Sequence, residues 1–467
     1  KRIALGTAAD AEKNRTRALL PVAENARRIL ERYPPKKGTS EKLRKQIRTA
    51  YENAEAAIVK QEKLDETIAS VDKSLKAGNT QEALATRLRL LARYPELEGD
   101  KTLGKTLPQI LKSERELVAR TEPNRDALTT EQRVGLPLAA TLAFHSRPRS
   151  DGDSDGRVAF VVAKDCCYGI DAVTGRPLWR RVIGRDTPFS PLPVSTVRGT
   201  QVVETLLLFE SATQNLSLVE LRSGKLLWRQ PLGERPSGPP RLHEGQIYLA
   251  TASRHLFAIE VESGRIVTRL EFPQAVLGPP ALVGETDRLV IAGEQGVCYT
   301  LSIRPLECSR VSYTGHQPAS IESPLVEMGP LLLIAENADR SCLLRVIDAS
   351  AESGRVRQVA SYPLKGQVRD RAIIRGKDLF VPFEAEQLAA FTVTNPDDVA
   401  DSDETTALAF VDAHAEKEPV STPIFLTAGS DGQLWMASTA LRKLRLTSRK
   451  IQTEPVSAAP GEFTQPL

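Results

Sequence analysis

The sequence lacks several features that would have assigned the chain to a class. It contains no apolar run near the roughly 18 residues that a membrane-spanning helix needs, so no transmembrane segment is predicted. Its five cysteines are an odd number and include no C-x-x-C spacing, which disfavours a cysteine-ligated metal site and a disulfide framework. Aromatic residues make up 5% of the chain and are not interleaved with basic strands. A platform for single-stranded nucleic acid is therefore not expected.

Catalytic motifs are also missing. The chain has no H-E-x-x-H, no G-x-S-x-G and no P-loop. Its five histidines are scattered, and we expect each to be a surface residue or an internally satisfied one. These histidines are His145, His243, His255, His316 and His414. The chain opens on Lys1-Arg2-Ile3 without Met or a signal-like segment, which suggests a fragment or a processed form.

The first third of the chain has the composition of helices. Strong helix formers dominate, and apolar residues at helical spacing predict helices over residues 11–33, 41–76, 79–94 and 107–120. Pro34-Pro35 and Gly78 are stop signals, and Asn79 with Glu82 is a capping-box pattern. Residues 1–135 carry 28 Lys and Arg against 20 Asp and Glu. This mixture favours a solvated helix surface, with an acidic partner as the alternative.

Part of this helical arm resembles a known repeat. The stretch from Gly78 to Leu84, followed by Leu91 and Tyr94-Pro95, is similar to one helix pair of a tetratricopeptide repeat. Such repeats stack and present a concave binding surface. A plain helical hairpin or a coiled coil remains the alternative, because the two matching helix ends, at Arg28–Pro34 and Arg89–Pro95, are not spaced by the repeat period.

The rest of the chain repeats one short phrase. Residues 168–179 and 218–228 each contain an apolar strand, a Thr-Gly or Ser-Gly turn and a strand that ends in Trp. Residues 257–267 keep the turn and lack the Trp. A strand repeat of 40 to 50 residues is typical of propeller blades. The units that we expect are 139–183, 189–233, 238–273, 279–315, 323–364, 370–412 and 421–456, with Leu138–Phe144 as a strand that closes the ring.

These units resemble the PQQ-like propeller repeat of quinoprotein dehydrogenases and of non-catalytic relatives, among them an outer-membrane assembly lipoprotein. The resemblance implies a propeller of seven or eight blades in which the Trp packs blade against blade. A quinone enzyme would also need a tryptophan floor and a bound calcium. Trp179 and Trp228 occupy the structural repeat position and Trp435 lies in a hairpin, so we expect no quinone site and no enzyme.

Two further motifs have a chemical interpretation. Asp151, Asp153 and Asp155, with Gly156, match the first half of a calcium loop, although position twelve is Val162 rather than Glu. A solvated acidic hairpin is the favoured interpretation, and calcium is the alternative. Quinoprotein alcohol dehydrogenases have a ring disulfide between two adjacent cysteines beside their cofactor, and Cys166-Cys167 is an adjacent pair of this kind. On a strand, adjacent side chains point to opposite faces, so two reduced thiols are expected here.

The resulting hypothesis is an α+β multidomain protein. Its expected parts are a helical arm (1–122), a linker (123–138), a PQQ-like propeller (139–457) and a C-terminal tail (458–467). We expect a non-enzymatic scaffold for protein partners, with a bacterial cell-envelope location favoured by the resemblance alone. The alternatives are a degenerate quinoprotein oxidoreductase and the sensor region of a larger receptor such as a kinase.

Overall fold

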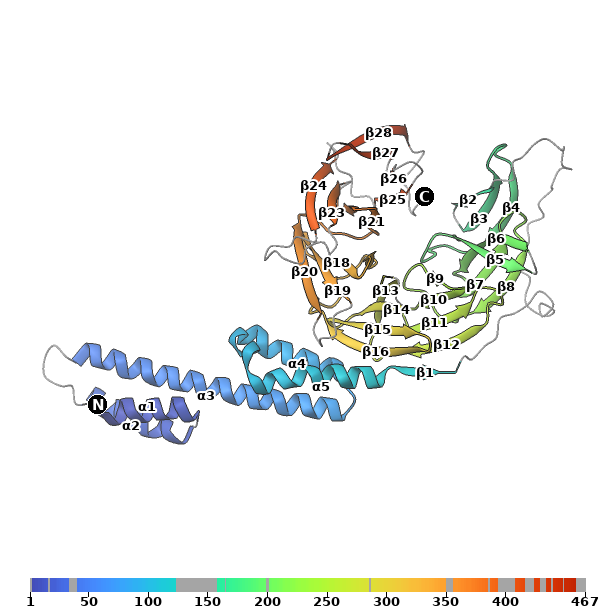
Figure 1. The fold of residues 1–467 in the computed structure, drawn as a ribbon. Coiled ribbons are helices and arrows are strands. Elements are labelled where there is room, and N and C mark those ends of the chain that lie inside the picture. Colours follow the sequence, from blue (N-terminus) through green and yellow to red (C-terminus); the bar gives the residue numbers. More distant parts are fainter. Residues whose placement is uncertain are drawn as a thin grey trace. The chain divides into compact units, whose positions relative to one another are not determined.

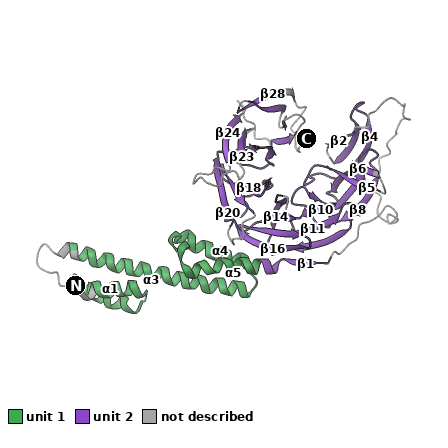
Figure 2. Ribbon diagram, in the orientation of Figure 1, with its two compact units in different colours: residues 1–114 green, residues 115–467 purple. Residues whose placement is uncertain are grey.

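The computed structural model describes the chain in two compact units, residues 1–114 and 115–467 (Figure 2). Helices form the first unit and antiparallel sheets form the second (Figure 1), so the predicted fold class is confirmed. The described residues are 2–15, 17–32, 40–122, 158–163, 165–198, 201–284, 287–349, 356–384, 387–393, 408–415, 424–428, 434–437, 440–447 and 449–458.

The helical segments follow the predicted order with one additional break. They are α1 (Arg2–Asn14), η1 (Arg17–Leu19), α2 (Leu20–Arg32), α3 (Ser40–Lys76), α4 (Thr80–Arg93), η2 (Pro95–Gly99) and α5 (Lys101–Leu117). The single helix expected over residues 11–33 is wrong. Arg15 has a φ of 50°, in the left-handed region, and this ends α1 before α2 begins.

The long helix α3 is shared by two hydrophobic clusters. Ala54 and Ile58 pack with residues of α1 and α2, whereas Leu64 packs with Leu90 of α4 and Leu103 of α5. Each of these groups therefore buries its apolar stripe against a different part of α3. No helix among the described residues combines the length and the apolarity that crossing a bilayer requires.

The caps of the last two helices correct one prediction and confirm another. The Asn79 side chain accepts a 3.1 Å hydrogen bond from the Glu82 amide and caps α4, as expected. The last helix was expected to begin after Thr106, but it begins at Lys101. Its actual cap is Asp100, whose Oδ1 accepts from the amides of Thr102 at 2.9 Å and Leu103 at 3.0 Å.

The second unit is a seven-blade β-propeller, and the blade limits follow the expected repeat units. Blade one contains β2 (Val158–Ala163), β3 (Cys166–Asp171) and β4 (Pro177–Val182). Blade two contains β5 (Leu192–Arg198), β6 (Gln201–Glu210), β7 (Asn215–Glu220) and β8 (Leu226–Pro231). Blade three contains β9 (Arg241–His243), β10 (Gln246–Ala250), β11 (His255–Glu260) and β12 (Ile266–Glu271).

Four more sheets complete the described part of the ring. Blade four contains β13 (Val276–Leu282), β14 (Arg288–Gly293), β15 (Val297–Ile303) and β16 (Leu306–Tyr313). Blade five contains β17 (Val326–Met328), β18 (Leu331–Ala338), β19 (Ser341–Asp348) and β20 (Arg357–Leu364). Blade six contains β21 (Ile373–Arg375), β22 (Asp378–Phe383), β23 (Gln387–Val393) and β24 (Leu408–Ala415). Blade seven contains β25 (Phe425–Ala428), β26 (Leu434–Ala437), β27 (Ala440–Thr447) and β28 (Lys450–Ala458).

Within each blade the strands pair in chain order, and the first strands lie innermost (Figure 1). The first strands of blades three to seven contact one another in succession. Blade one has three described strands, which match the second to fourth strands of the other blades. The predicted closing strand Leu138–Phe144 lies outside the described residues.

Blade three has a fifth strand that the sequence did not reveal. The strand β1 (Ala119–Thr121) pairs antiparallel with the outer strand β12. Arg120 donates to Thr268 Oγ1 at 3.2 Å, and Arg269 Nε donates to Thr121 Oγ1 at 2.7 Å. Only Val118 separates α5 from β1, so the chain passes from its last helix directly into the edge of this blade.

The repeated Gly phrase is a turn with one geometry in three blades. Gly175, Gly224 and Gly264 have φ of 69°, 66° and 73°, a region that favours glycine. Each donates its amide to the carbonyl of the residue four positions earlier, over distances of 2.8 to 2.9 Å. A Cβ on Gly224 would overlap the Trp179 indole, and one on Gly264 would overlap that of Trp228. The glycine is therefore required by the backbone and by the neighbouring blade.

Two tryptophans bind blade one to blade two and blade two to blade three, as the resemblance implied. Trp179 Nε1 donates to the carbonyl of Leu221, and Trp228 Nε1 donates to that of Val261, both at 2.7 Å. Each acceptor is the first residue after the third strand of the following blade. Trp228 is 2% exposed. The indole thus buries a large apolar surface and also satisfies its single donor.

Both tryptophans occupy a position marked by a bulge between the third and fourth strands. We call it the bulge position: the outer-strand residue whose pairing directly precedes the shift in register. In blades one to six it is held by Trp179, Trp228, Thr268, Arg310, Ala360 and Asp412. Arg310 donates at 2.7 Å to Ala349, the same acceptor position that the tryptophans use. Asp412 instead accepts from the Ile451 amide at 2.8 Å.

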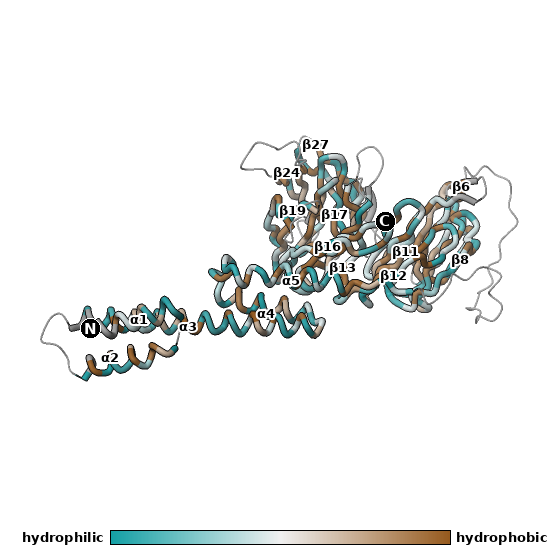
Figure 3. Tube along the Cα trace, turned by 60° about the horizontal axis from the view of Figure 1, so that its bottom comes forward, coloured by the Kyte–Doolittle hydropathy of each residue, from teal (hydrophilic) through white to brown (hydrophobic). Residues whose placement is uncertain are grey.

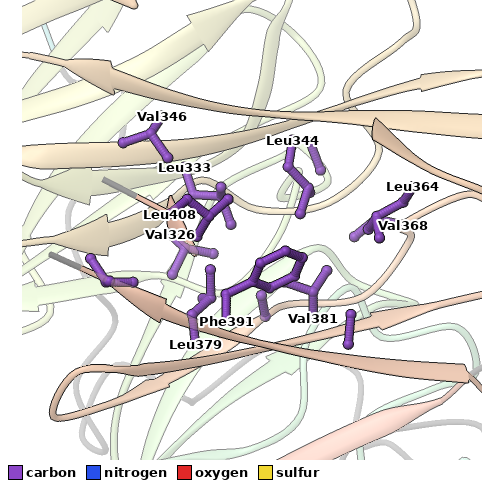
Figure 4. Packing of buried hydrophobic residues seen from close by; sticks show 14 of the residues in the cluster. Val326, Leu333, Leu344, Val346, Leu364, Val368, Leu379, Val381, Phe391 and Leu408 are labelled. Atoms are coloured by element: carbon purple, nitrogen blue, oxygen red, sulfur yellow. The ribbon is translucent and has the colours of Figure 1, made fainter. Parts of the chain in front are cut away.

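Between the blades, apolar side chains form the core. Hydrophobic segments run along the propeller strands in Figure 3. Because both faces of a blade are covered by its neighbours, inner strands carry continuous buried runs such as residues 206–209 and 331–334. Figure 4 shows one such layer, where Leu333, Leu344 and Val346 of blade five face Leu379 and Phe391 of blade six. Because each layer joins two sheets, the ring is stabilised by contacts between successive blades.

We expect Trp228→Ala to lower the free energy of unfolding by about 3–5 kcal/mol, because it removes a buried aromatic side chain. Trp228→Phe keeps most of the apolar surface and loses the hydrogen bond, which should cost about 1 kcal/mol from that bond. Urea denaturation monitored by far-ultraviolet circular dichroism measures both. Trp435→Phe is the control, since the Trp435 indole makes no hydrogen bond to the described residues. Equal losses at both tryptophans in the Phe variants would contradict the role of the hydrogen bond.

Asp370, which precedes β21, gives a pH dependence. Burial raises its pKa to about 6, although the amides of Arg371 and Leu426 act in the opposite direction. A raised pKa in the folded state means that stability from this group is present below about pH 4 and is lost as pH rises through about 6. Asp370→Asn should therefore stabilise the propeller at pH 8 by about 2 kcal/mol and much less at pH 4.5. Asp339→Asn, in an exposed loop, is the control, and a pH-independent gain at position 370 would contradict the assignment.

Candidate functional site

The propeller presents two loop surfaces, because antiparallel strands place alternate connections at opposite ends. We call one the connecting face. It carries the blade-to-blade connections and the loops between second and third strands. The other, the turn face, carries the remaining loops, including the Gly turns. The blade-to-blade connections are residues 183–191, 232–240, 272–275, 314–325 and 365–372. The longest described connections therefore gather on the connecting face.

A repeated backbone contact holds this face in place. At each junction from blade one to blade six, an amide in the loop between second and third strands, or at the end of the second strand, donates to a carbonyl in the preceding connection. The donor–acceptor pairs are Ser211 to Ile183, Ala252 to Arg235, Glu294 to Ala275, Asn337 to Ser320 and Glu384 to Gln367, over distances of 2.7 to 3.0 Å. The connecting face is consequently a fixed surface rather than a set of independent loops.

Side chains reinforce the same junctions. Glu234, in the connection before blade three, lies 2.8 Å from His255 Nδ1 and accepts from Thr251 Oγ1 at 2.6 Å. In the next connection, Gln274 Oε1 accepts from the Gln295 amide at 2.6 Å. Thr251 is fully buried, so the Glu234–His255 pair has no exposed nucleophile beside it. Its role is to join two blades.

His316 is also internally satisfied. Its Nδ1 lies 2.6 Å from Thr314 Oγ1 and its Nε2 lies 2.7 Å from the carbonyl of Gly293. Burial lowers its pKa, which agrees with a neutral ring that donates from Nε2 and accepts at Nδ1. The interpretation of His255 and His316 as satisfied residues therefore agrees with their hydrogen bonds.

An open pocket of about 430 Å³ lies between blades four and five. Its lining residues are Tyr313, Thr314, Gly315, Arg345, Val356 and Gln358. Arg345 donates to Gln358 Oε1 at 2.8 Å, to Glu336 at 3.1 Å and to the carbonyl of Thr314 at 2.8 Å. Its guanidinium is thus occupied by structural partners. The lining contains no paired nucleophile and base. It combines polar side chains, among them Thr314 and Gln358, with the apolar side chain of Val356.

An ion pair crosses the innermost strands. Arg241 of β9 lies 2.7 Å from Glu327 of β17, so the pair joins blades three and five past blade four. Glu327 also accepts from the amide of Leu282 in β13 at 2.6 Å. Three successive inner strands are therefore held together beside the axis of the propeller, the region where a quinone would have to bind.

The other predicted site residues fall in different places. Asp151, Asp153 and Asp155 lie outside the described residues, so the calcium interpretation stays a prediction. Cys166 and Cys167 are free and buried on adjacent positions of β3. Cys167 packs in the core between blades one and two, and burial raises its pKa to about 12. Cys166 accepts from Arg180 Nε at 3.1 Å.

Sequence reasoning did not identify Arg345, Glu336 or the Arg241–Glu327 pair. The Arg241–Glu327 pair joins blades that are far apart in the chain. Arg345 and Glu336 lie on the neighbouring strands β19 and β18, and no local motif marks their contact. Arg310 was overlooked for another reason. It replaces the Trp at the bulge position, so a search for the repeated Trp passes over it.

Comparison with known proteins gives one family. The profile described as outer membrane protein assembly factor BamB matches residues 152–235 and 212–402, together more than half of the chain. No curated protein matches the chain.

Two solved structures are similar at low identity. Crystal structures of BamB from Moraxella catarrhalis and of a mitotic checkpoint complex each share 13% identity with the chain. The first covers 66% of this chain and 85% of its own with a TM-score of 0.39, and the second covers 61% and 82% with 0.42. At these values neither similarity carries an argument about function.

Proposed function

The chain belongs to the family of outer membrane protein assembly factor BamB, and from this premise we propose that it is a non-enzymatic scaffold that holds protein partners in the bacterial cell envelope. The name of the family states an assembly role, and we extend that role to this chain. The single observation that supports it most is the connecting face, where backbone hydrogen bonds fix the loops of successive blades. A rigid surface made of variable loops suits protein recognition.

Two sets of contacts argue against quinone chemistry, one on the outer strands and one beside the axis. A quinone floor would use a tryptophan, but Trp179 and Trp228 are committed to their inter-blade hydrogen bonds. The Arg241–Glu327 pair holds the inner strands of blades three to five together. These contacts favour a packed axis over a cofactor cavity, and they make the oxidoreductase alternative the weaker one.

The helical unit supplies a second surface in this proposal. We propose 1–122, 123–138, 139–457 and 458–467 as the limits of arm, linker, propeller and tail. The arm carries the excess of positive charge, and its salt bridges join neighbouring or nearby side chains on the surface, as Glu24 does with Arg27 and Arg28. An acidic segment of a partner would complement such a surface.

Photo-crosslinking from the two faces tests the scaffold function. A photoreactive amino acid placed at Ser253 or Asp339 samples the connecting face, and one at Arg222 or Glu262 samples the turn face; all four positions are exposed. In bacterial cells that express the chain, we expect Ser253 and Asp339 to capture the same envelope protein. The turn-face positions are the matched control. The same capture from both faces, or none from either, would reject the proposal.

Cofactor titration tests the enzymatic alternative. Purified protein is mixed with pyrroloquinoline quinone and calcium, and uptake is followed by quinone absorbance after desalting, together with dye-linked oxidation of an alcohol. We expect no stoichiometric uptake and no oxidation, because Trp179, Trp228 and the inner strands of blades three to five are occupied by structural contacts. Tight uptake of the quinone in a one-to-one ratio would overturn the proposed scaffold function in favour of an oxidoreductase.

A further inference from the structure

A cluster of three side chains that can bind metal lies on the turn face, at the opposite end of the strands from the connecting face. His243 and Glu244 end the first strand of blade three and enter its tight turn, and Asp287 precedes β14 of blade four. One ligand atom from each of the three residues lies within 4.8 Å of the other two. The cluster therefore brings an imidazole and two carboxylates together from two blades.

The distance between His243 and Asp287 does not fit a hydrogen bond. His243 Nε2 and Asp287 Oδ1 are 3.6 Å apart, whereas N–H···O bonds span about 2.7 to 3.2 Å. Two ligands of one zinc ion, each about 2.0 to 2.2 Å from the metal, lie at such a separation when the angle between them is wide. The spacing is thus that of two ligands around a shared ion.

His243 Nε2 is also left unsatisfied. The atom is shielded from solvent and makes no hydrogen bond to any described residue. Two other propeller histidines behave differently, because His255 and His316 each have a partner within 2.9 Å of a ring nitrogen. A shielded ring nitrogen without a hydrogen bond needs another partner, and the Asp287 carboxylate lies 3.6 Å from it.

Arg304 forms ion pairs with both carboxylates of the cluster, those of Glu244 and Asp287. Its Nη1 lies 2.8 Å from Glu244 Oε2, and its Nη2 binds Asp287 Oδ2. One oxygen of each carboxylate is thereby engaged, and the second remains for an ion. Carboxylate ligands are commonly oriented by such an outer hydrogen bond. Glu244 itself has a φ of 45°, an uncommon conformation for a residue with a side chain.

We propose that His243, Glu244 and Asp287 bind a zinc ion that joins blades three and four. Mixed imidazole and carboxylate ligands suit zinc, whereas calcium takes oxygen ligands alone. Three protein ligands leave one position of a tetrahedral ion for water. Because the ligands come from two blades, the ion acts as a cross-link of the propeller, with no requirement for catalysis.

The test uses the full chain in a Cys308→Ser background, since Cys308 is the one cysteine among the described residues that is not fully buried. After removal of metals by chelation, ZnCl₂ is titrated by isothermal calorimetry. We expect one zinc per chain and a rise in the thermal midpoint. His243→Ala and Asp287→Asn should each weaken binding at least about tenfold, as loss of a ligand does. His414→Ala, on blade six, is the matched control and should bind as the parent does.

Two results would overturn the proposal. The first is a parent protein that takes up no zinc; if Arg304→Gln then binds it, the guanidinium fills the site in the native protein. The second is zinc binding that survives both His243→Ala and Asp287→Asn, which would place the ion elsewhere. Glu244→Gln gives an independent check, since it removes a ligand from an exposed turn and leaves the strand pairing in place.

Discussion

The hydrogen bond from the bulge position to the next blade is the contact on which the propeller depends. In blades one, two and four it places a side chain of the outer strand against the turn of the following sheet, so that these blades complete the core of their neighbours. Arg310 shows that the geometry matters more than the indole, because its guanidinium reaches the same acceptor position. Where the bulge position holds Thr268, the added strand β1 and its Arg120 contact that residue.

Most of the fold could be predicted from sequence because its signals are local. A Gly turn between two apolar strands repeats closely enough to place the first three blades, and the later blades follow from the spacing of the strand repeat along the chain. The strand β1 could not be predicted, because three residues after a helix carry no periodicity and their partner β12 is far along the chain. The early start of α5 was hidden by Pro108, which looked like a first-turn residue but lies inside the helix.

The candidate sites were less predictable, since their residues meet only in the folded ring. His243 was expected to be a surface or an internally satisfied histidine, and nothing near it in sequence indicates Asp287, which the ring places on the adjoining blade. The Arg241–Glu327 pair depends in the same way on the closeness of inner strands around the axis. Single-residue interpretation did succeed for Trp179 and Trp228, because their role is written into the repeat itself.

The entry of the chain through blade three has a mechanical meaning. Tension applied to the helices by a bound partner would reach the propeller first through the ladder between β1 and β12, and not through blade one, where the ring begins in sequence. Antiparallel strands resist or yield to such a pull according to its direction, by sliding or by unzipping. Blade three is therefore the first part of the propeller on which a pull on the helices would act.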